Sequence, residues 1–445
     1  MGKPNSLLRR VLYAVFFGVG GAMISRVFMA LASVVLANLL GQENFGKFSS
    51  VHDTINLFVT FSGVGVSATL TRYIAANRQS PELQGVFVRT LSKACMAMSL
   101  VLSLAMLVFA PQISRLTCAT EELAGYFRLV AVAVFFAAMA AVEQSVMLGF
   151  ERFAASSFMQ LVQCSLYCLL CWLLSRPWGI NGAVWALVIS YGVQLLLSCI
   201  SNHIYLKKNN IPLRWRWDSL TKQAMVGFAL PTFAAGLFVL PVNWIGTAIL
   251  NRTAGFGEKA VFTIALQWMT YITYVPSQLG QMRPIYTDLY AKGEAKRLKK
   301  LLFTTILLTT AAAAVIGGGV MLFKNAILGI YGDGFLRGGL TLGFMIGAAV
   351  LYTAQVQTGF LLQASGRMWI GLAINAFWAA CLLGTYLCQT HLGSLGYAIG
   401  YCVAYGVTLT LQLAVVLREL RRMHTNTDTQ GESHEESNAG VRHTA

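Results

Sequence analysis

A few ionisable side chains interrupt the long apolar segments of this chain, and Arg26 is the deepest of them. Arg26 lies about fifteen residues into the first apolar segment, which in a helix places it near the middle of a bilayer. A charge at that depth is costly, so it is a candidate for function. Its guanidinium offers forked donors that match phosphate oxygens and keeps its charge when desolvated. The structural alternative is an ion pair with Asp53, about two turns into the next segment.

Other titratable groups could couple transport to an ion. His52 and Asp53 are adjacent, and a carboxylate beside an imidazole can titrate near neutral pH; a solvated helix end is the alternative. Glu143 lies in the inner half of the fourth segment, where a buried carboxylate could carry a proton. A contact inside the bundle near Arg152 is the competing interpretation. Arg128 enters the same segment from the outer side, where snorkelling and exposure to a cavity remain equally open.

Amide side chains are scattered through the apolar segments, and their ordinary role is hydrogen bonding between helices. As a group they could line a cavity that accepts sugars, for which the candidates are Asn243, Gln267, Gln355 and Gln357. Three prolines could act as hinges, although proline is also tolerated in membrane helices that do not move: Pro231, Pro241 and Pro276. The cysteines near residue 168 lack a His or Asp that would complete a metal site, so we expect no metal or cofactor.

Long apolar segments must position these residues. Hydrophobic residues make up 56% of the 445 residues and charged residues only 11%, whereas a soluble chain carries roughly a quarter charged residues. About twelve segments are long enough to cross a bilayer, near residues 11–38, 46–71, 88–110, 122–148, 154–175, 179–206, 223–250, 258–282, 300–323, 338–362, 368–389 and 393–418. Backbone groups in lipid must be bonded internally, so these segments are helices. The sequence therefore predicts an all-α polytopic membrane protein.

The net charge of +16 has a spatial pattern. If the N-terminus is cytoplasmic, Lys and Arg on the cytoplasmic side outnumber those on the opposite side about three to one, as the positive-inside rule requires. Both termini are therefore expected to face the cytoplasm. Topology and anionic membrane lipids account for the basic balance, so no nucleic-acid partner is expected.

The chain also repeats itself at an offset of 214 positions. Gly41 pairs with Gly255 at this offset, Gly179 with Gly393, and residues 191–193 with 405–407. A duplicated half is how many secondary transporters are built. Because each half holds six helices, both insert with the same orientation, related by a pseudo-twofold axis along the membrane normal. The expected division is an N-terminal bundle (1–206), a cytoplasmic linker (207–222), a C-terminal bundle (223–422) and a disordered cytoplasmic tail (423–445).

Several motifs along these spans resemble the polysaccharide biosynthesis protein family, the Wzx-type flippases of lipid-linked oligosaccharides. The motifs lie at residues 39–48, 71–75, 149–153, 228–231, 283–286, 293–294 and 363–367. Each motif is short, but their order and spacing are specific, and together they cover residues 7–420. The resemblance implies a MATE-like fold of two six-helix bundles around a central cavity.

The resemblance also implies a function and a location. It implies translocation of an undecaprenyl-pyrophosphate-linked oligosaccharide from the cytoplasmic to the periplasmic leaflet of a bacterial inner membrane, with glycan polymerase or assembly proteins as candidate partners. The alternative transporter is a MATE-like, ion-coupled exporter of small organic molecules. A membrane glycan polymerase or ligase is the third class, and the short outer loops without facing carboxylates disfavour an enzyme. Arg26 has the apolar Leu240 as its repeat counterpart, so we expect the N-terminal half to handle the phosphate.

Overall fold

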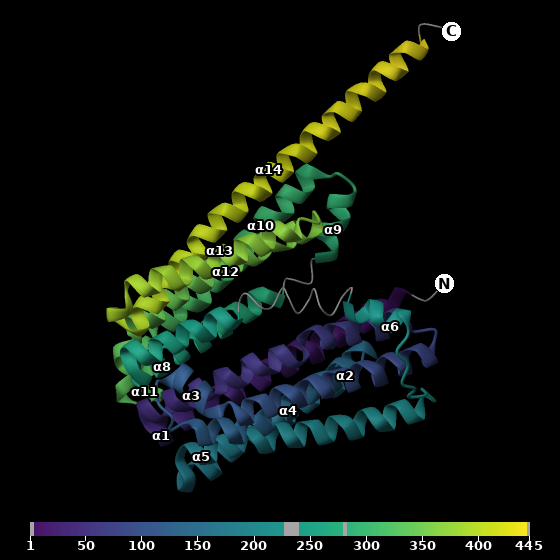
Figure 1. Ribbon diagram of the computed structural model, residues 1–445. Coiled ribbons are helices and arrows are strands. Elements are labelled where there is room, and N and C mark those ends of the chain that lie inside the picture. Colours follow the sequence, from purple (N-terminus) through teal and green to yellow (C-terminus); the bar gives the residue numbers. More distant parts are fainter. Residues whose placement is uncertain (1–3, 227–239, 279–282, 443–445) are drawn as a thin grey trace. The chain divides into compact units, whose positions relative to one another are not determined.

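The computed structural model describes residues 4–226, 240–278 and 283–442, and it is helical almost throughout (Figure 1). The described residues contain no strand. The elements are α1 (Pro4–Ala76), α2 (Pro81–Val108), α3 (Ala110–Cys118), α4 (Ala124–Gly149), α5 (Phe153–Lys208), α6 (Ser219–Ala224), α8 (Leu240–Gln278), α9 (Arg283–Ala291), α10 (Ala295–Leu322), α11 (Lys324–Ile330), the 3₁₀ turn η3 (Asp333–Gly338), α12 (Gly339–Ala364), α13 (Met368–Cys388), the 3₁₀ turn η4 (Thr390–Leu392) and α14 (Ser394–Arg442).

Eight helices of the described residues are long and apolar enough to cross a membrane. They contain ten of the expected segments, because α1 and α5 each hold two. The expected segments near 223–250 and 258–282 fall on α8 and on residues that the structure does not describe. The all-α polytopic fold predicted from composition is therefore confirmed.

Glycines at repeat-equivalent positions adopt the same unusual backbone conformation. Gly41 in α1 has φ 73° and ψ 170°, and Gly255 in α8 has φ 85° and ψ 175°. Gly179 in α5 and Gly393 before α14 share ψ −129°, with φ 54° and 58°. Glycine reaches these regions without the Cβ clash that other residues meet. The repeat in the sequence is thus also a repeat in backbone geometry.

The break at Gly179 makes α5 a hairpin of two antiparallel helices. Arg152, just before α5, donates from Nη1 to Oδ1 of Asn202 near its end, 2.9 Å away. Gly182 is packed so tightly after the turn that a Cβ there would lie 2.0 Å from the carbonyl oxygen of Leu174. Its repeat partner Gly396 has the same role, since a Cβ there would lie 2.4 Å from a backbone oxygen.

The chain forms two compact units. Unit 1 comprises residues 1–263 and 328–336, and unit 2 comprises residues 264–327 and 337–445. In unit 1, α1, α2, α4 and α5 lie side by side around a core that includes Ile74, Phe87 and Val142 (Figure 1). In unit 2, α10, α12, α13 and α14 pack around Tyr286, Phe360 and Val416. The expected division at 207–222 rests on the sequence repeat and stays a prediction.

The last helix is longer than the sequence predicts. α14 continues to Arg442, so it includes most of the segment 423–445 that is expected to be a disordered tail. That segment contains no proline, the residue that most strongly ends a helix.

Candidate functional site

A buried ion pair joins the two sequence repeats inside unit 1. Lys259 of α8 is only 1% exposed, and its Nζ lies 2.5 Å from Oδ2 of Asp53 in α1, whose side chain is 29% exposed. Removing an ammonium group from water costs several kcal/mol, and a carboxylate at hydrogen-bond distance is what offsets that cost. Both residues lie on helices that the sequence places in the membrane, where a charge pair of this kind marks a candidate functional site.

Helical spacing sets the shape of this site. Ser49 and Asp53 are four residues apart on α1, and so are Lys259 and Thr263 on α8, so each pair lies on one helix face. Thr263 donates its hydroxyl to Oγ of Ser49 at 3.3 Å, beside the ion pair. The two helix faces are therefore in contact at two positions, Ser49 with Thr263 and Asp53 with Lys259.

A second stripe on α1 extends the polar contact. Asn251 donates from Nδ2 to Oγ of Ser50 at 3.0 Å and to the carbonyl oxygen of Thr117 at 3.1 Å. Trp244 donates its indole N–H to Oγ1 of Thr54 at 3.0 Å. Asn251 and Ser50 are buried, so their hydrogen bonds would be costly to lose. We call these residues together with the ion pair the α1–α8 polar contact: Ser49, Ser50, Asp53, Thr54, Trp244, Asn251, Lys259 and Thr263.

Glycine lets the two helices approach this closely. A Cβ on Gly46 would lie 1.9 Å from the carbonyl oxygen of Phe256, a distance that no side chain can tolerate. Next to it, Gln42 donates from Nε2 to the carbonyl oxygen of Gly257 at 3.0 Å. The motif at 39–48 thus provides both the break at Gly41 and the close packing beside the α1–α8 polar contact.

Arg26, His52 and Asp53 all lie on α1, in different surroundings. Asp53 forms its ion pair with Lys259 of α8. Arg26 is half-buried and lies 27 residues before Asp53, on the other side of the break at Gly41. His52 is half-buried beside Asp53, with its ring stacked on Phe48 at a centroid distance of 6.2 Å.

Lys259 is the functional candidate that sequence reasoning missed, because the sequence alone places it at the outer end of a helix. A signal was present: Lys259 is followed by Ala260, Val261 and Phe262, and it lies four residues before Thr263 on the same helix face. A lysine inside an apolar helical run is a membrane-embedded charge and needs a partner.

Glu143 lies in a polar chain within unit 1. Asn202 of α5 donates from Nδ2 to Oε2 of Glu143 at 2.7 Å, and its Oδ1 accepts from Arg152 at 2.9 Å. Arg152 lies in the turn between α4 and α5, where burial lowers the pKa of its guanidinium. Asn202 therefore bridges the carboxylate and the guanidinium, which is the bundle-internal contact that competes with a proton carrier as the interpretation of Glu143.

A family model described as "Polysaccharide biosynthesis protein" matches residues 11–281, more than half of the chain. The chain belongs to the polysaccharide biosynthesis protein family. The match includes the α1–α8 polar contact and the turn at Arg152, and it confirms the resemblance drawn from the motifs.

Two relatives extend the likeness beyond that stretch. The chain is 23% identical over 422 residues to "EPS I polysaccharide export inner membrane protein EpsE" of Ralstonia solanacearum, covering 92% of this chain and 96% of the relative. The protein of the same name from Ralstonia nicotianae is 22% identical, with 92% and 95% covered. The likeness therefore spans both repeats.

Solved structures show which fold this family member has. A multidrug resistance MATE family transporter of the MOP superfamily, in an inward-facing conformation, matches with a TM-score of 0.76 at 18% identity, covering 90% of this chain and 96% of that one. A MOP superfamily transporter from Pyrococcus furiosus matches with a TM-score of 0.66 at 16% identity, covering 95% and 97%. The MATE-like fold expected from the resemblance is confirmed.

The remaining candidate residues of this family member are divided between the two units. Arg128 is exposed on α4, and Asn243 is half-buried near the start of α8, both in unit 1. Gln267, Gln355 and Gln357 belong to unit 2.

The three glutamines of unit 2 have different hydrogen bonds. Gln267 donates from Nε2 to the hydroxyl of Tyr271 at 2.5 Å. Gln355 accepts from Thr408 at 3.4 Å. Gln357 is 1% exposed, and its Oε1 has no hydrogen-bond partner among the described residues. A buried oxygen of this kind is a natural acceptor for water or a ligand hydroxyl.

The prolines differ in position. Pro241 is the second residue of α8 as described. Pro276 is inside α8, two residues before its last residue, and is buried. Pro231 lies outside the described residues.

Proposed function

We propose that this protein is a flippase, which moves an undecaprenyl-pyrophosphate-linked oligosaccharide from the cytoplasmic to the periplasmic leaflet of a bacterial inner membrane. The observation that carries the proposal is the family match over residues 11–281, extended by the likeness to the Ralstonia polysaccharide export proteins over 92% of the chain. Their names support an inner-membrane location and an exported polysaccharide. They also support transport rather than catalysis.

The cargo explains why polar groups lie inside apolar helices. Two phosphates and a hydrated sugar cannot enter hydrocarbon without replacement of their water. Arg26 is the residue that we propose contacts the phosphates, because its fork matches their oxygens. Arg128 and the amides Asn243, Gln267, Gln355 and Gln357 are the proposed cavity residues. Gln357 is the strongest of the amides, since its buried Oε1 has no partner in the described part of the chain.

The coupling residues are proposed from the charges of the α1–α8 polar contact. Asp53 and Lys259 neutralise each other at 2.5 Å, so protonation of Asp53 would leave a buried ammonium group unpaired and weaken the contact. His52 is adjacent to this pair and is the second residue proposed for coupling. Glu143 is the third candidate, in its chain with Asn202. Pro231, Pro241 and Pro276 remain the proposed hinges.

An ion-coupled exporter of small organic molecules is the alternative, and the MATE-like fold is the observation that favours it. An organic cation prefers an acidic, aromatic cavity. The acid Asp53 is already neutralised by Lys259, and Arg26 adds positive charge to the same bundle. These charges support an anionic cargo.

Transport in proteoliposomes tests the proposal. The purified protein is reconstituted with a fluorescent undecaprenyl-pyrophosphate disaccharide, and the fraction accessible to an added glycosidase is followed over time. We expect exposure of the sugar within minutes, and exposure roughly ten- to a hundredfold slower with Arg26→Ala. Efflux of ethidium without movement of the lipid-linked sugar would support the exporter instead. Reporter fusions at residues 2 and 445 test the proposed cytoplasmic location of both termini, and crosslinking tests a glycan polymerase partner.

A further inference from the structure

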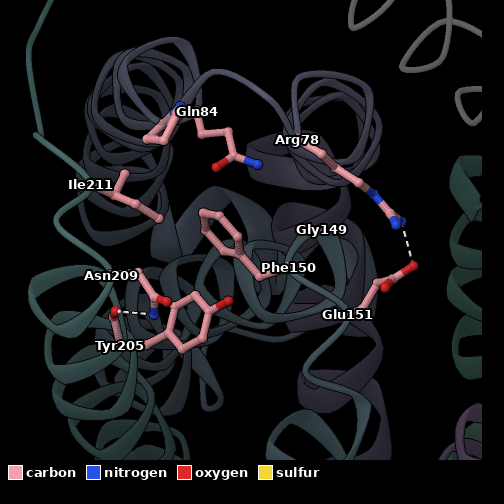
Figure 2. A pocket seen from close by; sticks show the side chains of 9 residues that line it. Arg78, Gln84, Gly149, Phe150, Glu151, Tyr205, Asn209 and Ile211 are labelled. Atoms are coloured by element: carbon pink, nitrogen blue, oxygen red, sulfur yellow. Dashed lines mark hydrogen bonds and ion pairs between the residues drawn. The ribbon is translucent and has the colours of Figure 1, made fainter. Parts of the chain in front are cut away.

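A cavity of about 300 Å³ lies in unit 1 where α1, α4 and α5 end and α2 begins (Figure 2). It is lined by Arg78, Pro81, Gln84, Gly149, Phe150, Glu151, Tyr205, Asn209 and Ile211. The end of α1 is 23 helical residues beyond Asp53, roughly 35 Å along the helix. The cavity is therefore separate from the α1–α8 polar contact, on the side that the positive charges place toward the cytoplasm.

An ion pair closes one side of this cavity. Arg78, in the turn after α1, pairs with Glu151, in the turn after α4, and the two side chains are 52% and 41% exposed (Figure 2). Because the charges cancel, the ion pair offers donors and acceptors without net charge. Such a pair suits hydroxyl groups, which both donate and accept, better than it suits a phosphate.

The other walls are aromatic and amide groups. Phe150 lies at the centre of the view, with Gln84 on one side and Tyr205 on the other (Figure 2). The ring centroids of Phe150 and Tyr205 are 5.2 Å apart. The guanidinium of Arg152 lies over the ring of Tyr205, with its Cζ 4.5 Å from the ring centroid. Gln84 and Asn209 donate to backbone carbonyl oxygens at 3.0 and 2.8 Å, which leaves their amide oxygens as acceptors.

The backbone at Glu151 shows that its carboxylate is retained at a cost. Glu151 has φ +57°, a left-handed conformation that disfavours any residue with a Cβ. In the second repeat the turn with the same hydrogen-bond pattern, one position beyond the offset of 214, has Gly366 at φ +71°. In both turns this residue bonds to the carbonyl three positions back, and the following arginine to the carbonyl five positions back. The turns are the same, yet the first carries a carboxylate where glycine would be free of strain.

The turn itself does not need that carboxylate. Arg152 is held by Asn202 at 2.9 Å and by the hydroxyl of Ser201 at 2.6 Å, while Glu151 pairs with Arg78. In the second repeat Arg367 is held by Glu419 at 2.6 Å, a residue of the last helix. The carboxylate of Glu151 is thus directed to Arg78 at the edge of the cavity rather than to the arginine of its own turn.

We propose that this cavity binds a sugar, as a docking site for the glycan part of the cargo before translocation; the role of the sugar as cargo rests on the proposed function. Its volume lies at the lower end of the range for small-molecule sites, about 300–1,000 Å³, which fits one sugar ring. Planar amides, a hydroxyl and a neutral ion pair bind hydroxyl groups, and the Phe150 ring offers an apolar face to the C–H side of the ring.

Saturation-transfer NMR on the full-length protein in lipid nanodiscs tests this directly. The probes are glucose, galactose, N-acetylglucosamine and, separately, inorganic phosphate. We expect saturation transfer to at least one of the sugars and no displacement of it by equimolar phosphate. Glu151→Gly should weaken binding at least tenfold while its thermal midpoint stays equal or rises, because glycine relieves the strained φ. Tyr205→Phe, which removes only a hydroxyl, should weaken binding about threefold.

Asp288→Asn is the matched control, because it breaks the exposed Lys292–Asp288 pair of unit 2 and should leave sugar binding unchanged. Absence of transfer to every sugar, equal binding by Glu151→Gly, or displacement by phosphate would overturn the docking site. The flipping assay separates the two proposals. Sugar binding without flipping would contradict the proposed function alone, and flipping without sugar binding would contradict the docking site alone.

Discussion

Ser49 and Thr263 occupy equivalent positions in the two sequence repeats and are hydrogen-bonded to each other, with Thr263 donating to Ser49 at 3.3 Å. A residue that contacts its own repeat counterpart is expected where a twofold axis passes between them. The offset of 214 in the sequence is thus also the separation of a contact in the structure.

The ion pair next to this contact breaks the symmetry. The repeat counterpart of Asp53 is Gln267, and that of Lys259 is Phe45. The ion pair is thus a property of one position in the repeat and has no counterpart at the other.

Replacing Asp53 should destabilise unit 1 more than replacing Lys259, its partner in the ion pair. Asp53→Leu leaves an ammonium group that is 1% exposed without its carboxylate, which should cost about 3 kcal/mol or more. Lys259→Met leaves a carboxylate that is 29% exposed and still reaches water, so about half that loss is expected. Thermal midpoints in detergent measure both.

The double variant provides the control for this asymmetry. Asp53→Leu with Lys259→Met removes both charges, so it should be more stable than Asp53→Leu alone. Strictly additive losses would mean that the pair is not coupled, and would contradict the geometry.

Alanine at the repeat-equivalent glycines should be costly for a backbone reason. Gly41→Ala and Gly255→Ala meet no atom within 4 Å of the new Cβ, so they create no clash. Both positions have φ above +70° with ψ near 170–175°, a region that is almost exclusive to glycine, so each should lose about 1–3 kcal/mol. Gly318→Ala in α10 also meets open space but has no positive φ, so its thermal midpoint should not fall. Equal behaviour of the three variants would refute the argument.

These glycines illustrate how much of the fold can be predicted from the sequence. The offset identifies which glycines are equivalent, and apolar length identifies ten spans that the described helices contain. Both are properties of the local chain. The partner of Asp53 is not predictable in the same way, because Lys259 lies 206 residues away and only tertiary packing brings the two together.

The cavity at Glu151 could not be predicted from the sequence either, because it also depends on tertiary packing. Its walls come from the ends of four helices, and neither periodicity nor composition reports how such ends converge. One local sign exists, because Glu151 precedes Arg152 in the first turn, whereas Gly366 precedes Arg367 in the second. A helix that ends in a left-handed residue other than glycine is uncommon enough to attract attention.

Glu143→Gln should separate the two roles considered for this residue. The amide oxygen of glutamine can still accept from Asn202 at 2.7 Å, so the polar chain to Arg152 and the thermal midpoint should be preserved. If Glu143 carries a proton, flipping in proteoliposomes should fall at least tenfold, since an amide does not titrate. Normal flipping by Glu143→Gln, with lower stability for Asn202→Leu, would assign the chain to structure alone.

Arg26→Ala and Arg26→Lys test whether a charge inside α1 handles phosphate. Hydrogen bonds to charged groups contribute about 1.5–3 kcal/mol, so loss of the guanidinium should reduce flipping roughly ten- to a hundredfold. Lysine keeps the charge but not the fork, and it should recover only part of the activity because a single ammonium group cannot bond two phosphate oxygens in parallel. The amount of surface glycan in a deletion strain is the second measurement. At equal membrane levels of each variant it should fall from wild type to Arg26→Lys to Arg26→Ala. Normal glycan with both variants would exclude Arg26 from phosphate handling, because no cation would then be required at that depth of the helix.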